Sequence, residues 1–322
     1  MNTKKKILLL LGSIVLVYAI FILGKTAKVI GFLNSNISTP LPPTEEEIEA
    51  LGKNFPLPAE EDDRWDVLIL GIRGSGDPDG GLLSDSIMLF SIDKKTEKTS
   101  LISIPRDIYV DLPGMAKGKI NEIYEKGIAS QKETDFPKEA FSRLTGVHID
   151  NIIVLDFKAF QEIVDALGGV DITLNKPFEE KGQWGYSFSL PVGPNHLKGQ
   201  DALYFVRSRY STNDFDRSIR QQQIVLAIKD KAFSAGILAN PVKLGSILKS
   251  INKNIVTDLN IFDTSNVIKL ANSFDTQRKQ PILGHLSTDN LLYQTYQSDI
   301  YILQPQNNDW EIFRNYFKEI LD

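Results

Sequence analysis

The chain has 322 residues, 42% of them hydrophobic, and a formal net charge of -5. This length is enough for one large domain with additional segments, and the acidic balance argues against a broad nucleic-acid-binding surface. The absence of cysteine excludes disulfides, a thiol nucleophile, cysteine-bound zinc and a lipid-modified cysteine anchor, and the three histidines are too scattered for a histidine-rich metal site.

The N-terminal segment is expected to be a membrane anchor. Three lysines, Lys4 to Lys6, precede an uncharged run over residues 7–24. A helix over this run rises about 1.5 Å per residue and spans roughly 27 Å, close to a bilayer core. A cleaved signal peptide is the alternative, but its apolar region is usually only about 7 to 15 residues long. The lysine cluster predicts a cytoplasmic tail over residues 1–6, with the bulk of the chain outside the cell membrane.

Residues 25–64 are predicted to form a linker. They are rich in proline and glutamate and poor in periodic apolar positions. The extracytoplasmic domain is therefore expected to occupy residues 65–322.

That domain is predicted to be α/β. Short β-rich runs predict strands at 65–71, 85–92, 99–104, 152–156 and 170–174. Amphipathic patterns predict helices at 157–167, 200–206, 214–234, 241–251, 261–273 and 309–321. Because strands and helices are interleaved, we expect a mixed central sheet flanked by helices on both faces.

Two familiar kinds of active site are not supported. The glycine-rich segment 71–76 (GIRGSG) is followed by neither Lys-Ser nor Lys-Thr and precedes a predicted strand, so it indicates a turn and not a phosphate-binding P-loop. The chain also lacks a G-x-S-x-G elbow, and its histidines have no recognisable serine and carboxylate partners.

Residues 204–223 (YFVRSRYSTNDFDRSIRQQQ) are exceptionally rich in arginine beside apolar residues. On a helix capped by Asn213 or Asp214, the side chains of Asp214, Arg217 and Gln221 share one face. That face continues into apolar positions, which predicts that the polar residues turn inward. Buried arginines need an anion, and their donor geometry suits phosphate or pyrophosphate. A solvated helix face with ordinary ion pairs is the alternative.

Taken in order, the motifs resemble those of the LytR-CpsA-Psr proteins of bacterial cell envelopes. The resemblance covers nearly the whole chain and rests on DVLILG, LSDSIMLFSIDKKTEKTSLISIPRD, GKINEIY, FKAFQEIVDALGGVDI, LPVGPNHLKGQDALYFVRSR and NDFDRSIRQQQ. It implies a membrane-anchored phosphotransferase. Such an enzyme takes a glycopolymer from a polyprenyl-pyrophosphate carrier and transfers it, with one phosphate, to a hydroxyl of peptidoglycan during cell-wall assembly.

The resemblance also implies roles for individual residues. Its pyrophosphate ligands, together with the neighbouring arginines of the cluster, give the set Arg73, Arg106, Arg207, Arg209, Arg217, Arg220 and Gln221. The residues expected to take part in catalysis are Arg106, Asp107, Asp214 and Arg217. Asp85 of the S-D-S motif is the expected ligand of Mg²⁺ or Mn²⁺, and Lys119 and Asn121 are expected near the site.

Three positions depart from the family pattern. Arg73 stands where members usually have aspartate, Leu83 where they have arginine, and Glu122 where they have histidine. Arg73 could supply the charge that is missing at Leu83, and Glu122 could return an acid near the site. Two other functions therefore stay open: a lipid pyrophosphate phosphohydrolase, and a non-catalytic binding or regulatory envelope protein.

A lipid carrier also requires an apolar groove. We expect the groove between the sheet and the helices, lined by Ile153, Leu155, Phe160, Val164, Ile224 and Ile228.

Overall fold

The computed structural model describes residues 44–77, 81–234, 253–259 and 281–322, with Gly245 and Ile247 in addition. The expected anchor at 7–24 and the predicted helix at 261–273 lie outside these ranges, as does most of the helix predicted at 241–251. Among the residues that are described, no helix combines the length and the apolar character needed to cross a membrane.

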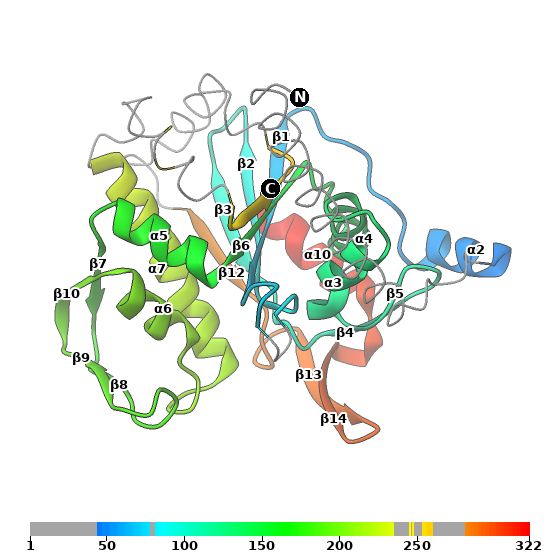
Figure 1. Cartoon of the computed structure of the whole chain (residues 1–322). Coiled ribbons are helices and arrows are strands. Elements are labelled where there is room, and N and C mark those ends of the chain that lie inside the picture. Colours follow the sequence, from blue (N-terminus) through cyan, green and yellow to red (C-terminus); the bar gives the residue numbers. More distant parts are fainter. Residues whose placement is uncertain (1–43, 78–80, 235–244, 246, 248–252, 260–280) are drawn as a thin grey trace, which may run out of the picture. The chain divides into compact units, whose positions relative to one another are not determined.

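A mixed sheet of six strands forms the centre of the described chain (Figure 1). Its order is β11 (Ile255–Thr257), β6 (Asn151–Asp156), β1 (Arg64–Ile72), β2 (Ser84–Asp93), β3 (Thr99–Ser103) and β12 (Ile282–His285). Strand β1 is parallel to β6 and antiparallel to β2, while β12 is parallel to β3. The prediction of a mixed sheet is confirmed.

Strand residues alternate between two apolar cores, as the two-residue period of a strand requires. In β1, Leu68 and Leu70 belong to one core, and Val67 and Ile69 belong to the other. Both faces of the sheet must therefore be covered.

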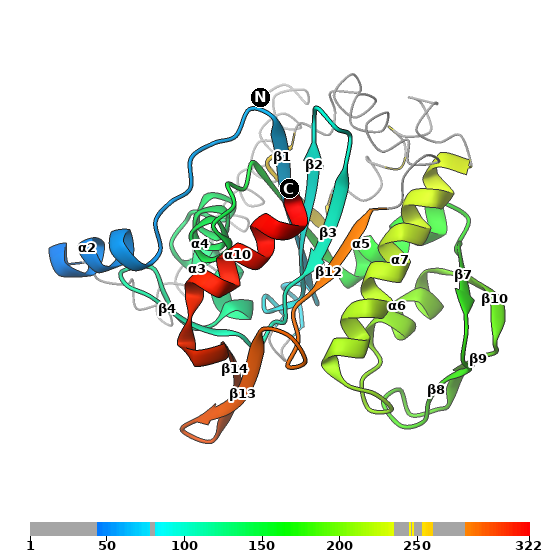
Figure 2. The same ribbon diagram turned by 180° about the vertical axis from the view of Figure 1, so that it is seen from behind.

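Helices cover the two faces as predicted (Figures 1 and 2). One face carries α3 (Ile123–Ala129), α4 (Asp135–Thr145) and α10 (Trp310–Leu321), whereas α5 (Phe157–Ala166), α6 (Gly199–Arg207) and α7 (Asp214–Ser234) lie on the other. Helix α5 is amphipathic and is capped by Asp156, whose carboxylate accepts a hydrogen bond from the Ala159 N–H at 2.7 Å.

Short strand pairs outside the central sheet were not predicted, apart from β7. They are β4 (Tyr109–Leu112) with β5 (Ala116–Lys119), β7 (Val170–Leu174) with β10 (Gly193–Leu197), β8 (Phe178–Glu180) with β9 (Phe188–Leu190), and β13 (Leu292–Gln297) with β14 (Ile300–Pro305). Two single-turn 3₁₀ helices, η1 (Ile120–Glu122) and η2 (Gln306–Asn308), are also present. The β13–β14 hairpin is joined to the I-P-R-D segment, because Leu303 donates its backbone N–H to the Asp107 carbonyl at 2.9 Å.

The predicted linker contains a helix, α2 (Glu45–Asn54). Thr44 caps it, and Glu47 completes a reciprocal capping box. Phe55 follows and is buried against Trp310 of α10, with ring centroids 5.4 Å apart. Packing against the domain thus begins before residue 65, contrary to our reading of this stretch as linker up to residue 64.

Candidate active site

Two cavities meet beside the ends of β1 and β2. The first has a volume of about 290 Å³ and is lined by apolar residues of the sheet and of α5 to α7, including Met88, Leu155 and Val206. The second has a volume of about 490 Å³ and a more polar lining. Both cavities are lined by Asp85, Ser86, Arg106, Arg217 and Gln221. The polar residues that form this shared boundary are the candidate site.

Asp85 lies between two arginines at this boundary. The turn after β1, predicted from GIRGSG, is present: Gly74 has a φ of 122° and donates its N–H to the Gly81 carbonyl at 2.9 Å. The turn places Arg73 Nε 3.4 Å from Asp85 Oδ2, while Arg106 forms an ion pair with Asp85 Oδ1. The positive charge of Arg73 is therefore located beside the S-D-S motif, as the departure from the family pattern suggested.

One hydrogen-bond donor of Arg106 has no acceptor among the described residues. Its Nε is buried without a hydrogen-bond partner and lies 3.6 Å from carboxylate oxygens of both Asp107 and Asp214. Burial lowers the pKa of Arg106, but the carboxylates of Asp85, Asp214 and Asp107 outweigh burial and raise that pKa. Arg106 is therefore a fixed cation that can offer a hydrogen bond to a ligand.

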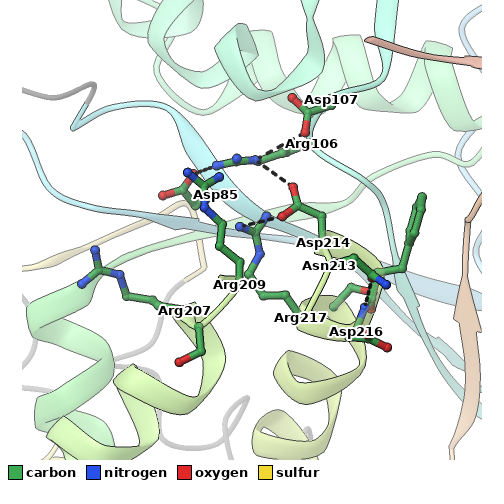
Figure 3. A network of polar contacts seen from close by, with 12 residues as sticks. Asp85, Arg106, Asp107, Arg207, Arg209, Asn213, Asp214, Asp216 and Arg217 are labelled. Atoms are coloured by element: carbon green, nitrogen blue, oxygen red, sulfur yellow. Dashed lines mark hydrogen bonds and ion pairs between the residues drawn. The ribbon is translucent and has the colours of Figure 1, made fainter. Parts of the chain in front are cut away.

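Helix α7 supplies the other side of the cluster (Figure 3). Asn213 caps the helix by accepting a hydrogen bond from the Asp216 N–H at 2.8 Å. Asp214 Oδ1 lies 3.3 Å from Arg217 Nη1, and Arg217 is only 7% exposed. Burial is the largest cause that lowers the pKa of Arg217; Arg106 lowers it further and Asp214 opposes both. The predicted inward turn of this face is confirmed.

Arg207 and Arg209 line the first cavity from the end of α6. The Arg207 guanidinium packs against the rings of Phe157 and Trp184, with its carbon 4.1 and 4.9 Å from the ring centroids. Burial and the nearby charge of Arg73 lower the pKa of Arg207. Figure 3 shows Arg209 extending toward Asp85 and Arg106, with Arg207 to one side.

The lining of the first cavity is therefore rich in positive charge. The residues that line the first cavity include Arg73, Arg106, Arg207, Arg209 and Arg217 but only two carboxylates, Asp85 and Asp156. Guanidinium groups gathered in this way favour an anionic ligand. A ligand with two linked phosphates would offer the oxygens to satisfy several guanidinium groups at once.

Three predicted residues lie elsewhere. Arg220 lines neither cavity: it is buried against Phe178 and Phe205 and donates hydrogen bonds to the backbone carbonyls of Phe205 and Ser208. Burial lowers its pKa to about 10. Arg220 therefore holds the connection between α6 and α7, and its assignment as a phosphate ligand does not agree with this position.

Lys119 and Asn121 also lie outside both cavity linings. Lys119 Nζ donates to Asp107 Oδ1 at 2.6 Å, so it reaches the site only through Asp107, which lines the second cavity. Asn121 is buried and its Oδ1 has no partner. Glu122 pairs with Lys126 at 2.5 Å and lines neither cavity, so it does not return an acid to the site.

The predicted lipid groove is partly correct. Leu155 and Phe160 line the first cavity, but Ile153, Val164, Ile224 and Ile228 do not. Val164 and Ile224 are fully buried in the core between α5, α6, α7 and β7. On α7 it is Val225, one position further, that reaches the cavity. The helical period predicts an apolar face, but it does not tell which apolar position of that face lines the cavity and which packs into the core. That depends on how the helix lies on the sheet.

Several lining residues escaped sequence reasoning. Gln183 and Trp184 lie in the loop between β8 and β9, and Tyr301 and Gln294 belong to the β13–β14 hairpin. A signal for the hairpin was present, since LYQTYQ and IYILQP are β-rich runs separated by Ser-Asp. Because the hairpin is far along the chain from the S-D-S motif, nothing in the sequence indicated that it lines the same cavity.

Comparison with known proteins agrees with this architecture. The model of the LytR_cpsA_psr family matches residues 32–315. The polyisoprenyl-teichoic acid–peptidoglycan teichoic acid transferase TagU of Oceanobacillus iheyensis is 30% identical, over 91% of this chain and 86% of that protein.

Two solved structures are similar in fold. The crystal structure of TagV from B. subtilis has a TM-score of 0.62 and 24% identity, covering 82% of this chain and 99% of that chain. A structure of TagT bound to LIIa-WTA has a TM-score of 0.61 and 23% identity, covering 81% of this chain and 94% of that chain. With a family model that spans most of its length, the chain belongs to the LytR_cpsA_psr family.

Proposed function

We propose that this chain is a phosphotransferase that moves a glycopolymer, with one phosphate, from a polyprenyl-pyrophosphate carrier to a hydroxyl of peptidoglycan. The O. iheyensis relative is named a polyisoprenyl-teichoic acid–peptidoglycan teichoic acid transferase. The single observation that carries the proposal is the cluster of arginines beside two adjoining cavities, the first of which also has a row of apolar lining residues. An amphiphilic donor with a charged centre matches that arrangement.

The donor would lie across the boundary. Its prenyl chain would enter the first cavity against Leu155, Phe160 and Val206, which exclude water from the lipid side. The pyrophosphate would then lie among Arg73, Arg106, Arg207, Arg209 and Arg217, with Gln221 beside them. Phosphoryl transfer needs mainly positioning and stabilisation of charge on the phosphate oxygens, and fixed guanidinium groups supply both.

Two carboxylates are candidates for the base that accepts the proton of the attacking hydroxyl. Both form ion pairs, Asp107 with Lys119 and Asp214 with Arg217, but Asp107 is also buried. Asp214 is more exposed and lines the second cavity at the boundary. We therefore assign proton acceptance to Asp214 and a supporting role, holding Lys119 and Arg106, to Asp107.

A divalent cation, Mg²⁺ or Mn²⁺, is part of the proposal, with Asp85 as its protein ligand. Among the described residues, no three acidic or histidine side chains gather into a metal site. Mg²⁺, however, is commonly held by one or two carboxylates together with substrate phosphates and water. Asp85 fits this role, because it lines both cavities and each carboxylate oxygen can accept more than one contact. A bound cation would neutralise developing charge on the phosphates.

The proposal includes a membrane location. A segment over residues 7–24 would anchor the chain with its N-terminus in the cytoplasm, and the domain would meet the lipid-linked donor at the outer surface.

Product analysis with a lipid-linked glycan tests the function. We expect wild-type protein with Mg²⁺ and peptidoglycan to form a phosphodiester-linked glycan and release the prenyl monophosphate, and we expect EDTA to lower the rate. Release of phosphorylated glycan without acceptor would instead identify a phosphohydrolase. Binding of the donor with no product, with any metal, would identify a binding protein.

A further inference from the structure

The wall of the second cavity formed by the β13–β14 hairpin is not used by the function described so far. Gln294 and Tyr301 of the hairpin, with Thr288 and Asp289 of the loop before it, line this wall. The start of α7 also lines the cavity. The cavity is thus built from segments about 80 residues apart that meet at the site.

Several polar groups on this wall have no hydrogen-bond partner among the residues that the structure describes. Within the described ranges, the Tyr301 hydroxyl, the Gln294 amide and the Asp289 carboxylate form no hydrogen bond with a protein group. Ser103, only 3% exposed, also lines the cavity and its Oγ has no partner. Several unpaired donors and acceptors around one cavity suit a ligand that is rich in hydroxyl groups.

Tyr301 is held in a defined position. It is half-buried beneath the Lys119 ammonium, which lies 6.0 Å from its ring centroid. Burial first, and then the carboxylates of Asp107 and Asp214, raise the pKa of Tyr301. Its phenol therefore stays protonated and can donate a hydrogen bond close to Asp214.

The direction of the reaction assigns this cavity to the acceptor. In phosphoryl transfer the attacking and leaving oxygens lie roughly in line on opposite sides of the phosphorus. The leaving prenyl phosphate belongs on the side of the first cavity, since that cavity holds the lipid. The attacking hydroxyl must then approach from the opposite side of the arginine cluster, which is the second cavity.

We propose that the second cavity is the subsite for a sugar of the acceptor glycan strand, and that Tyr301 and Gln294 bind and orient this sugar. The inference rests on the proposed function. In the step, the acceptor O–H gives its proton to the Asp214 carboxylate as its oxygen forms a bond to the glycan-linked phosphorus. The bond from that phosphorus to the bridging oxygen breaks, and the electron pair remains on the prenyl phosphate, facing Arg207 and Arg209.

Steady-state transfer by the full chain, with a purified glycan-strand oligosaccharide as acceptor, tests the subsite. Losing one hydrogen bond should raise the acceptor KM about 3- to 10-fold in Tyr301→Phe and in Gln294→Ala. The donor KM should stay within about twofold of wild type, because neither side chain lines the lipid cavity.

Tyr293→Phe is the matched control. Tyr293 lies on the same hairpin, but its hydroxyl bonds Gln304 and Asn308 and it does not line the second cavity. Its acceptor KM should equal that of wild type. A raised donor KM in Tyr301→Phe, or an unchanged acceptor KM in both cavity variants, would overturn the inference.

A binding measurement separates this inference from the function itself. Absence of transfer in wild type would contradict the proposed function but would not decide about the subsite. Isothermal titration calorimetry with the same oligosaccharide then decides. Weaker binding to Tyr301→Phe, with unchanged binding to Tyr293→Phe, supports a glycan subsite. Absence of binding to wild type rejects it.

Discussion

The arginines that line the first cavity illustrate how side chains can be fixed in place for a ligand at a cost in free energy. Arg207 and Arg217 are buried enough that their pKa is lowered, yet each faces too few carboxylates to balance the cluster. Aromatic rings beneath Arg207 and the Asp214 contact of Arg217 fix the two guanidinium groups before any ligand arrives. A pyrophosphate would complete their hydrogen bonds without reorganisation.

Removal of single arginines should therefore weaken binding of the second phosphate selectively. Wild type should bind a prenyl pyrophosphate more tightly than the monophosphate. In Arg207→Ala and Arg217→Ala each lost charge-assisted contact should weaken pyrophosphate binding by about 1.5 to 3 kcal/mol. Calorimetry on the detergent-solubilised chain measures this difference, and equal affinity of wild type for both lipids would contradict the site.

Arg220→Met provides the contrast in the same helix. Because Arg220 donates to backbone carbonyls of residues 205 and 208 and lines neither cavity, this variant should lower the midpoint of thermal unfolding. The ratio of pyrophosphate to monophosphate affinity in the remaining folded protein should equal that of wild type. A fall of this ratio toward one would show that Arg220 does bind the pyrophosphate.

At the scale of elements, the sequence predicted best where a strong local pattern and the tertiary environment agree. The runs that became β1 and β2 are β-rich along their whole length, and α7 has an Asn213 cap followed by a continuous inward face. The arginine cluster was predictable for the same reason, because one helix face presents Asp214, Arg217 and Gln221 together.

The elements that were missed depend on partners far away in the chain. Helix α2 carries three successive glutamates in its first turn and only one buried residue, Leu51. Its composition is therefore typical of a linker, and only its neighbour α10 in the folded protein shows that this segment packs on the domain. The β13–β14 turn places Ser298 and Asp299 at positive φ, where Asn-Gly would be the expected signal. Without the hairpin, sequence reasoning could not bring Tyr301 to the second cavity.

If α2 belongs to the folded domain, Phe55 should contribute to stability like a core residue. Phe55 is 4% exposed and packs on Trp310 and the Arg314 guanidinium. We expect Phe55→Ala to lower the free energy of unfolding by about 3 to 5 kcal/mol in urea denaturation. Leu57, 52% exposed two residues later, is the matched control, and Leu57→Ala should change stability by less than about 0.5 kcal/mol. Equal effects of the two variants would show that Phe55 is not part of the core.

At the scale of the whole molecule, the proposed reaction requires the protein to reach two substrates in different places. The donor is a membrane lipid and the acceptor is a polymer outside the membrane, so the domain must stay near the bilayer while its second cavity opens toward the wall. An anchor over residues 7–24 with an external domain meets both demands.

This topology can be tested cleanly because the chain has no cysteine of its own. A membrane-impermeant maleimide applied to intact cells should label Leu57→Cys, whose side chain position is exposed on the domain, and should leave Thr3→Cys in the predicted cytoplasmic tail unlabelled. After permeabilisation both variants should react, which controls for the accessibility of each thiol. Labelling of Thr3→Cys but not Leu57→Cys in intact cells would reverse the orientation, and with it the access of the arginine cluster to peptidoglycan.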